Sequence, residues 1–302
     1  MLHSIRAFFA ERNVLEVETP GLSNAGVTDP QLRSFSTHFQ NKEYFLHTSP
    51  EFYMKRLLAA GSGDIYQLAK VFRDDENGRF HNPEFTLLEW YRLDFDHQQL
   101  MDEIENLLKR LMPEKCNHIN RISYQQAFIS QLQIDPLDAS TEDLKRCAKQ
   151  HHINTPQGMQ DNKDMWLDWL MLEKIAPGFS KSEFTFLYNY PASQASLARL
   201  DCEDDRIANR FELFFGELEL ANGFYELTDA QEQLKRFKKD NETRSQLKQK
   251  TMPIDYHLIA ALKSGLPDCA GVAIGIDRLM MLHSNAASIN KVISFGDEFI
   301  SE

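Results

Sequence analysis

The sequence is poor in cysteine and lacks long apolar runs. Its four cysteines, at positions 116, 147, 202 and 269, are widely scattered and form no C-x-x-C pair, which argues against a zinc site or a disulfide framework. No apolar run approaches the roughly 18 residues of a membrane span, and no signal-peptide pattern opens the chain. These absences predict a cytoplasmic protein without a membrane segment.

Basic residues are also outnumbered. The chain has 33 Lys and Arg against 45 Asp and Glu, a formal net charge of −12. A protein that binds tRNA or a duplex usually carries a basic stripe that offsets phosphate repulsion, and none is visible here. The basic cluster from Lys235 to Lys250 alternates with Gln, Asp and Glu, which predicts the solvent-exposed face of a long helix. The charge balance disfavours nucleic acid as the main partner and suits a basic one, while leaving both open.

Hydrophobic residues are abundant, at 42% with 21 Phe, which is enough for a large core. Because no internal repeat, low-complexity tract or linker interrupts the chain, residues 1–302 are predicted to form a single domain with a helical insertion around 114–182. The predicted strands form antiparallel hairpins mixed with helices, so the expected fold class is α+β. The predicted strands are 14–17, 65–73, 83–91, 184–189, 210–227 and the start of 271–282, and the predicted helices include 2–13, 50–61, a periodic helix after Asp96 and a polar helix after 227.

The predicted hairpin at 65–91 carries the first stretch with chemistry. Alternate side chains of a strand share a face, so Phe85, Glu89 and Tyr91 point the same way. An aromatic ring, a carboxylate and a phenol suit a pocket that holds a planar ring at one end and an ammonium at the other. Arg73, on the partner strand, can reach the same pocket with a permanent charge. An ordinary surface hairpin with cross-strand pairs is the alternative.

The second stretch is RFELFFGELELANGFYEL, residues 210–227. Glu212, Glu219 and Glu226 recur every seven residues, an odd interval that places neighbours on opposite faces of a flat strand. A turn near Gly216 would bring Glu212 and Glu219 together. Two converging carboxylates suit Mg²⁺ on triphosphate oxygens. The alternative is an exposed acidic hairpin.

The third stretch is GVAIGIDRL, residues 271–279, where a strand is predicted to turn directly into a helix. Small residues before a helix let a nucleotide lie against the backbone, and Arg278 in the first turn can meet a phosphate. Alone this signal is weak, because many strand–helix junctions look alike.

Together and in this order, these stretches resemble the signature motifs of the class II aminoacyl-tRNA synthetases. Residues 14–20 (VLEVETP) are similar to the dimer-forming first motif, 71–91 to the second and 271–279 to the third. The resemblance is closest to the lysyl branch, through HNPEFTLLEWY and ELANGFYELTD, and covers essentially the whole chain. It implies a class II catalytic core with a mainly antiparallel sheet flanked by helices, a homodimer, and the use of ATP and Mg²⁺.

The resemblance also implies the nucleotide contacts. Arg73 would bind the α-phosphate and stabilise charge in the transition state, and Arg278 would hold the γ-phosphate, so both are expected to be catalytic. Phe85 would stack on adenine. Glu212 and Glu219 would hold Mg²⁺. The full set of expected ATP contacts is Arg73, Asp74, Asp75, His81, Asn82, Phe85, Glu219, Leu220, Gly275 and Arg278.

The amino-acid site follows in the same way. Glu51, in the SPE sequence, would receive the amino group near the carboxylate, and Asn222 the carboxylate. Glu89, Tyr91 and Glu226 would receive the far ammonium of a lysine-like side chain, because neutral amino acids would leave buried charges unpaired. No general base is required, since a carboxylate is already the nucleophile. The full set of expected substrate contacts is Ser49, Pro50, Glu51, Glu89, Tyr91, Asn222, Glu226 and Ala273.

Two positions depart from the lysyl pattern. Asp75 stands where lysyl-tRNA synthetases have Glu to read the adenine amine. Asp is one methylene shorter, so either a small shift or Glu76 is expected to compensate. Ala273 stands where they tend to carry Gly, and the extra methyl in the pocket floor favours a substrate whose amine is displaced by one carbon, as in β-lysine.

The expected acceptor is a protein. Lysyl-tRNA synthetases carry an oligonucleotide-binding barrel ahead of the core, and here the first motif begins within about twenty residues of Met1, which leaves no room for it. A few residues of the first helix are also expected to be absent. The compact, acidic chain is similar to the lysyl-tRNA synthetase paralogues that pass activated (R)-β-lysine to a lysine side chain of elongation factor P.

Three alternatives remain. A tRNA-charging core that uses the acceptor stem alone is the first, although the missing barrel and the acidic charge disfavour tRNA. An asparagine-forming synthetase shares the fold, but the lysine-pocket carboxylates argue against it. A catalytically inactive regulatory paralogue is disfavoured by the intact Arg73, Arg278, Glu212 and Glu219.

Overall fold

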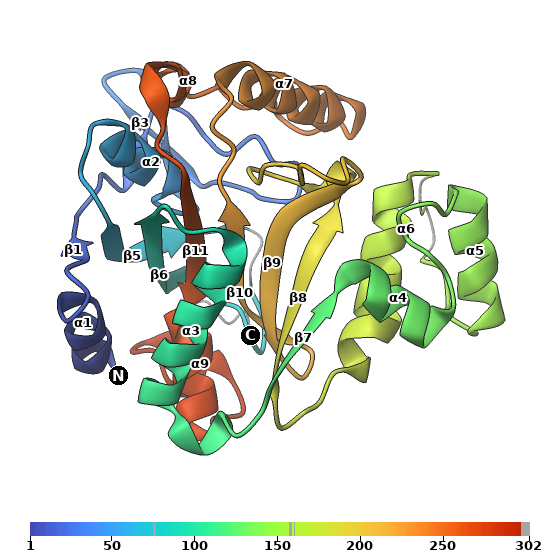
Figure 1. The fold of residues 1–302 in the computed structure, drawn as a ribbon. Helices are drawn as coiled ribbons and strands as arrows, with labels where there is room; N and C mark the ends of the chain where they lie inside the picture. The colour runs from blue at the N-terminus through green and yellow to red at the C-terminus, as the bar shows by residue number, and fades with distance from the viewer. Residues whose placement is uncertain (75–76, 157–158, 160, 297–302) are drawn as a thin grey trace. The chain divides into compact units, whose positions relative to one another are not determined.

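The computed structural model of the chain describes residues 1–74, 77–156, 159 and 161–296 (Figure 1). Two compact units divide the chain: the first unit comprises residues 1–96 and 226–302, and the second unit comprises residues 97–225. Within the described residues, no helix is long and apolar enough to cross a membrane. The elements of both units mix helices with mainly antiparallel strands, which is the predicted α+β class.

The first unit is built on a mixed sheet. In spatial order its strands are β1 (Leu15–Glu16), β5 (Ile65–Phe72), β6 (Glu84–Leu93) and β11 (Cys269–Gly275). Strand β1 is parallel to β5, and the other neighbours are antiparallel. The pairing of β5 with β6 confirms the hairpin predicted at 65–91. Helix α9 (Ile276–Ser284) follows β11 without a loop and packs against β6, so the predicted strand-to-helix junction is also confirmed.

A smaller antiparallel sheet and further helices complete the first unit. The small sheet has the order β2 (Leu22–Ser23), β4 (Lys42–Leu46), β3 (Ser36–Phe39). The helices are α1 (Leu2–Ala10), α2 (Glu51–Ala59), α7 (Ala230–Gln246) and α8 (Tyr256–Gly265). The Phe9 ring of α1 stacks on Tyr66 of β5 with 4.4 Å between ring centres. Helix α2 packs against α8 and buries Met54, Lys55 and Leu58, so a lysine lies among its buried residues.

One basic residue of α7 is buried as well. Arg244 is only 4% exposed. Its guanidinium donates hydrogen bonds to the backbone carbonyls of Thr28, Asp29 and Leu32 at 2.8, 2.6 and 2.7 Å. The prediction of a wholly exposed basic face between 235 and 250 is therefore wrong at Arg244, because these carbonyls replace the water that would solvate the charge.

The second unit has a sheet of its own. In spatial order its strands are β10 (Leu218–Tyr225), β9 (Ile207–Phe215), β8 (Phe184–Pro191) and β7 (Ile119–Ser123). Strand β7 is parallel to β8, and the others are antiparallel. Helix α3 (His97–Leu111) packs on β9 and β10. Its predicted apolar face is confirmed by the burial of Leu100, Ile104, Leu107, Leu108 and Leu111.

A helical part of the second unit falls in the range predicted as an insertion. Helices α4 (Tyr124–Leu132), α5 (Thr141–Gln150) and α6 (Lys163–Leu170) lie next to one another (Figure 1). They share an apolar core with Leu187 and Tyr190 of β8 and Phe214 of β9. This shared core fixes the helices on the sheet of their own unit.

Candidate active site

One face of β6 carries the predicted series of side chains. Glu89 and Tyr91 are buried, and Phe85 is half-buried near the start of the strand. Across from them on β11 are small residues: Ala273 pairs with Glu89, and Gly271 pairs with Tyr91. Directly paired residues of antiparallel strands project to the same face. The small neighbours therefore leave room beside the polar side chains of β6.

Two arginines lie near the start of β6. The guanidinium carbon of Arg73 is 5.1 Å from the ring centre of Phe85, a cation–π contact. Arg278, in the first turn of α9, donates from Nε to a backbone carbonyl of the loop before β6 at 3.3 Å. Its neighbour Asp277 accepts the backbone N–H of Thr86 at 2.6 Å. The start of α9 is thereby held beside the two residues predicted to bind adenine and the α-phosphate.

The remaining predicted nucleotide contacts of the first unit lie around the same loop. Asp74 follows β5 and donates its backbone N–H to another loop at 3.0 Å. His81 closes a short turn, and Asn82 is buried, with its amide donating to a carbonyl on β6 at 2.6 Å. Gly275 is the N-cap of α9. Asp75 lies outside the described residues, so its adenine contact stays a prediction.

Three carboxylates and a phenol converge in the first unit. Glu89 is 2% exposed and accepts a hydrogen bond from the Tyr91 hydroxyl at 2.8 Å. Glu226 is fully buried, and Glu51 begins α2. The Nζ atom of Lys55 lies 2.7 Å from Glu51 Oε1 and 2.6 Å from Glu226 Oε2. The structure therefore brings together the four residues predicted to receive amino groups, and it adds a cation that was not predicted.

Lys55 left a weak signal in the sequence. It stands four residues after Glu51, a spacing that is typical of an exposed ion pair on a helix. The structure instead buries the lysine to 1% exposure. The start of its helix is held by Pro50 at the N-cap and by Ser49, whose hydroxyl accepts the Glu51 backbone N–H at 3.3 Å.

Gly271 allows this convergence. A Cβ atom there would lie 2.3 Å from Cε1 of Tyr91 and 2.6 Å from Oε1 of Glu226. Packed atoms do not approach so closely, so both side chains occupy the space that any other residue would fill. The sequence signal for this position was the run of small residues in the third motif.

Burial and charge shift the pKa values of this group. Burial raises the pKa of Glu89 well above its usual range, and the carboxylates of Glu51 and Glu226 raise it further. Burial opposes the charge of Lys55, but the carboxylates of Glu226 and Glu51 outweigh it and raise the lysine pKa. Lys55 is thus charged. The second carboxylate oxygen of Glu89 is buried and accepts no hydrogen bond from the described residues, so it can receive a further donor.

A half-buried arginine, Arg210, contacts the predicted groups of the second unit. Nη2 of Arg210 lies 2.5 Å from Glu212 Oε1, and Nε donates to Asn222 Oδ1 at 3.2 Å. Nη1 donates to the carbonyl of Gln194 at 2.8 Å, and the guanidinium lies 4.5 Å from the ring centre of Tyr190. Glu212 and Asn222 are direct partners across β9 and β10. The only sequence signal for Arg210 is that it shares a strand face with Glu212.

The turn between β9 and β10 falls at Gly216, as predicted, where φ is +58°. Glu219 is exposed just after it, and Leu220 is buried at a β-bulge. Burial opposes the charge of Arg210, but nearby groups that include the carboxylates of Glu212 and Glu219 raise its pKa. Both predicted Mg²⁺ ligands therefore lie within electrostatic reach of one guanidinium.

Comparison with known proteins identifies the family of the chain. Residues 1–298 match the family described as tRNA synthetases class II (D, K and N). The chain belongs to this family. Proteins named elongation factor P–(R)-β-lysine ligase from Vibrio cholerae, Vibrio parahaemolyticus and Yersinia pestis are 50%, 49% and 48% identical to it. These alignments span 301 residues and cover 98% of this chain and 92%, 93% and 92% of the relatives. The predicted resemblance and fold class are confirmed.

Among the described residues, no cluster of three potential metal ligands occurs. Mg²⁺ needs fewer, because it usually binds through one or two carboxylates together with substrate phosphates and waters. Glu212 and Glu219 supply two carboxylates on one hairpin, of which Glu212 is already paired with Arg210. This donor set fits an ion that arrives on a phosphate chain better than a dedicated metal cage.

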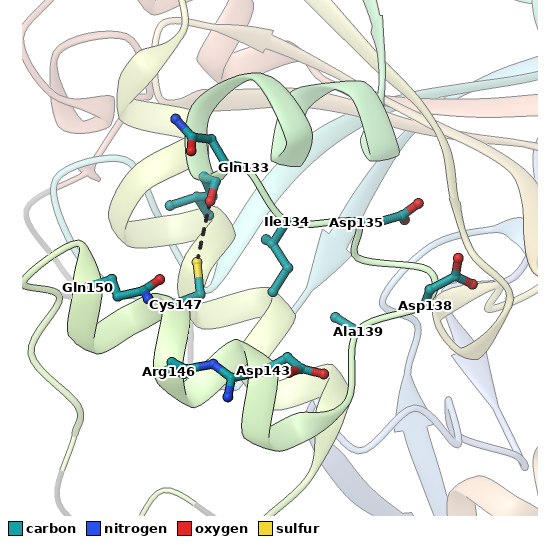
Figure 2. Close-up of a pocket in the computed structure, with 10 residues that line it drawn as sticks. Gln133, Ile134, Asp135, Asp138, Ala139, Asp143, Arg146, Cys147 and Gln150 are labelled. Carbon is teal, nitrogen blue, oxygen red and sulfur yellow. Dashed lines mark hydrogen bonds and ion pairs between the residues drawn. The ribbon is translucent and has the colours of Figure 1, made fainter.

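The chain also has a hollow of about 410 Å³ in the helical part of its second unit (Figure 2). Its acidic side chains have protein partners: Asp135 accepts a hydrogen bond from Gln125, and Asp138 pairs with Arg206. The thiol of Cys147 points at a backbone carbonyl of α4 (Figure 2). The described residues that line the hollow include none of those predicted to bind nucleotide or amino acid.

Proposed function

We propose that this chain activates (R)-β-lysine or lysine with ATP and transfers it to a lysine side chain of elongation factor P. The observation that carries the proposal is the convergence of Glu51, Glu89, Tyr91 and Glu226, in which the second carboxylate oxygen of buried Glu89 accepts no hydrogen bond from the described residues and suits an amino group. Relatives at 48–50% identity that are named elongation factor P–(R)-β-lysine ligase support the acceptor. The reaction class is an ATP-dependent, AMP-forming ligation.

The amino groups bind in the first unit. The far ammonium lies at Glu89, Tyr91 and Glu226, and the amino group near the carboxylate lies at Glu51. A substrate without the far ammonium would leave a buried carboxylate unpaired, which costs several kcal/mol. Ala273 pairs with Glu89 across the sheet, so its methyl narrows the floor beside the far ammonium and supports β-lysine as the substrate.

The substrate carboxylate binds to Asn222. Because Arg210 donates to Oδ1 of Asn222, the amide nitrogen of that side chain is left to donate elsewhere. A carboxylate of the substrate can accept a hydrogen bond from this N–H group. In the first unit, Ser49 and Pro50 fix the start of α2, which carries Glu51.

The nucleotide binds around the start of β6. Phe85 stacks on adenine, Arg73 contacts the α-phosphate and Arg278 the γ-phosphate. Guanidinium groups stay charged and neutralise the charge that grows on the phosphoryl oxygens. Mg²⁺ held by Glu212 and Glu219 would screen the charge of the triphosphate. The further nucleotide contacts in the proposal are Asp74, Asp75, His81, Asn82, Leu220 and Gly275.

Two displacements make up the reaction. A carboxylate oxygen of the amino acid attacks the α-phosphorus, the bond to the β-phosphate oxygen breaks, and pyrophosphate leaves. The acceptor amine then attacks the carbonyl carbon of the adenylate, AMP leaves, and the nitrogen loses a proton as the amide forms. The first step needs no general base because the nucleophile is already an anion, so positioning and charge neutralisation carry it.

A homodimer and a cytoplasmic location are further parts of the proposal. Leu15 of β1 is 56% exposed, and β1 lies at the outer edge of the first unit's sheet. An exposed apolar residue on an edge strand fits a symmetric contact between two copies. The same segment resembles the dimer-forming first motif.

Mass spectrometry of elongation factor P tests the proposed function. The protein is incubated with ATP, with either (R)-β-lysine or lysine, and with either elongation factor P or tRNA. We expect elongation factor P to gain the mass of one lysyl residue while tRNA stays uncharged. A factor whose acceptor lysine is replaced by arginine is the control. An unmodified factor alongside efficiently charged tRNA would overturn the proposal.

A further inference from the structure

We propose that Lys55 determines the specificity of the amino-acid pocket by acting as its built-in cation. It neutralises one of the three converging carboxylates and leaves the other two for the two amino groups of a diamino acid. This inference rests on the proposed function, because it concerns the lysine-type substrate of the same pocket. It assigns a role to a residue that none of the three motifs marks.

The position of Lys55 joins the two ends of the pocket. Its Nζ atom contacts Glu51, expected at the amino group near the carboxylate, and Glu226, expected at the far ammonium, at 2.7 and 2.6 Å. Neighbouring Met54 and Leu58 of α2 are buried as well. The lysine side chain is therefore held inside the first unit and is 1% exposed, in contrast to a surface lysine that turns into water.

The charges of the pocket fit this role. Glu51, Glu89 and Glu226 carry three negative charges when they are ionised, and Lys55 cancels one of them. Two remain, which matches the two ammonium groups of lysine or β-lysine. Without Lys55 the same substrate would leave one carboxylate unpaired in the interior, and a buried unpaired charge costs several kcal/mol.

Glu89 also supports this count of charges in the pocket. Its second oxygen is buried and accepts no hydrogen bond from the described residues. Burial and the neighbouring carboxylates hold its pKa high. An ammonium that binds beside it would lower this pKa, so Glu89 would ionise when the substrate binds. The titratable groups that interact with Lys55 are Glu51 from α2, Glu226 from just after β10 and Glu89 from β6, and the Tyr91 hydroxyl donates a hydrogen bond to Glu89. Removing the cation from this set would raise the pKa values of the carboxylates.

The first experiment measures amino-acid-dependent pyrophosphate exchange by the Lys55→Met variant from about pH 6 to pH 9, together with binding of a non-hydrolysable ATP analogue. We expect the KM for lysine or (R)-β-lysine to rise at least about tenfold near pH 7, with ATP affinity within about twofold of wild type. Part of this rise in KM should disappear at higher pH, because the carboxylates then ionise even without the charge of Lys55 beside them. Arg56→Met, which removes the neighbouring and more exposed cation of the same helix, should leave all three quantities within about twofold.

A second comparison separates charge balance from packing. Lys55→Met is expected to lower the melting temperature, and the double change Lys55→Met with Glu51→Gln should restore much of the loss, because it removes a carboxylate along with the cation. Lys55→Arg keeps the charge in a bulkier group and should keep the wild-type pH profile while raising KM. If Lys55 only fills space, the double variant will be no more stable than the single one.

The outcomes are distinguishable from a failure of the proposed function. A wild-type protein that activates neither lysine nor (R)-β-lysine overturns the proposed function, and the melting temperatures still decide the charge balance. An active wild type with unchanged lysine KM and pH profile in Lys55→Met overturns this inference alone. So does a double variant that fails to recover stability, including the case in which Lys55→Met does not fold.

Discussion

Lys55, buried in the first unit, and Arg210, half-buried in the second, are basic residues that both contact side chains predicted to bind substrate, yet their surroundings differ. Lys55 places a point charge between the carboxylates of Glu51 and Glu226. Arg210 spreads its planar fork over one carboxylate, one amide oxygen and one backbone carbonyl. The group around Lys55 keeps more carboxylates than cations. The group around Arg210 pairs the arginine with Glu212 and fixes the orientation of the Asn222 amide.

This difference matches what each basic side chain can do. An ammonium is compact and makes contacts in any direction, so it can sit among converging carboxylates without dictating their planes. A guanidinium has donors in a rigid fork and orients the groups that it binds. A pocket with surplus carboxylate receives cations, and an oriented amide donor receives an anion.

The largest expected effect lies outside both groups. Arg73→Ala should lower amino-acid-dependent pyrophosphate exchange by about 10²- to 10³-fold or more, because one fixed donor to a developing phosphoryl charge is worth that much. Lys70→Ala, three residues earlier on β5 and in an exposed pair with Glu84, should change exchange by less than about twofold. Near-normal exchange in Arg73→Ala would mean that neither group serves an adenylate-forming site.

Arg210→Lys would sharpen the comparison by giving the second unit the basic group of the first. The lysine can keep the pair with Glu212, but it cannot hold Asn222 and the Gln194 carbonyl at the same time. We expect kcat/KM for the amino acid to fall by about 10- to 100-fold, the worth of a charged hydrogen bond of roughly 1.5–3 kcal/mol. Steady-state exchange kinetics at saturating ATP measure this.

A matched control is Arg206→Lys. Arg206 makes exposed ion pairs with Asp138 and Asp204, so its replacement should leave kcat/KM within about twofold. If Arg210→Lys were equally silent, orientation of Asn222 by a fork would play no part in binding the carboxylate.

Glu89→Gln tests the surplus charge in the first unit. Burial, with the charges of Glu51 and Glu226, raises the folded-state pKa of Glu89 above the usual 4.5, so the folded protein binds more protons than the unfolded chain between these two pKa values. The free energy of unfolding of the wild type should therefore fall as pH rises through that window. The amide of the variant has no such proton to lose. Above the window the variant should therefore have a higher melting temperature than wild type, with about 2–4 °C for each kcal/mol of unfolding free energy gained. It should also lose lysine activation.

Thermal unfolding without substrate, from about pH 5 to pH 9, measures this effect. Glu84→Gln, at the half-exposed start of the same strand, is the control and should follow the wild-type pH dependence. Parallel curves for Glu89→Gln and wild type at every pH would show that Glu89 is not held protonated by its surroundings.

The parts of the fold that the sequence predicts well are those with short-range periodicity. The apolar face of α3 and the alternation of Phe85, Glu89 and Tyr91 on β6 depend on residues within a few positions of each other. The sequence does not predict the small sheet of β2, β4 and β3, because β2 has only two residues, β3 is exposed throughout and β4 has only five residues, too few for a clear alternation between apolar and polar residues.

The predicted site is strongest where a motif supplies the residues and weakest where distant segments meet. The spacing of Lys55 from Glu51 is that of an ion pair on the surface of a helix. Lys55 is buried because it also pairs with Glu226, which is distant in the sequence. Arg244 was likewise predicted to be exposed, because the carbonyls that enclose it belong to residues 27–32. Burial by distant partners leaves no local pattern in the sequence.

The smallest expected effect concerns the floor beside the surplus charge. Ala273→Gly removes the methyl group of the residue that pairs with Glu89 across the sheet. The far ammonium of the substrate could then lie closer to the backbone of β11. We expect the ratio of kcat/KM for (R)-β-lysine to that for lysine to fall by about three- to tenfold, since one methyl is worth roughly 1 kcal/mol in such a pocket. Ala270→Gly removes a methyl from the opposite face of β11 and carries the same loss of stability for a glycine in a strand. Only Ala273→Gly should change the ratio, and an unchanged ratio would assign the position of the amine to the carboxylates and Lys55 alone.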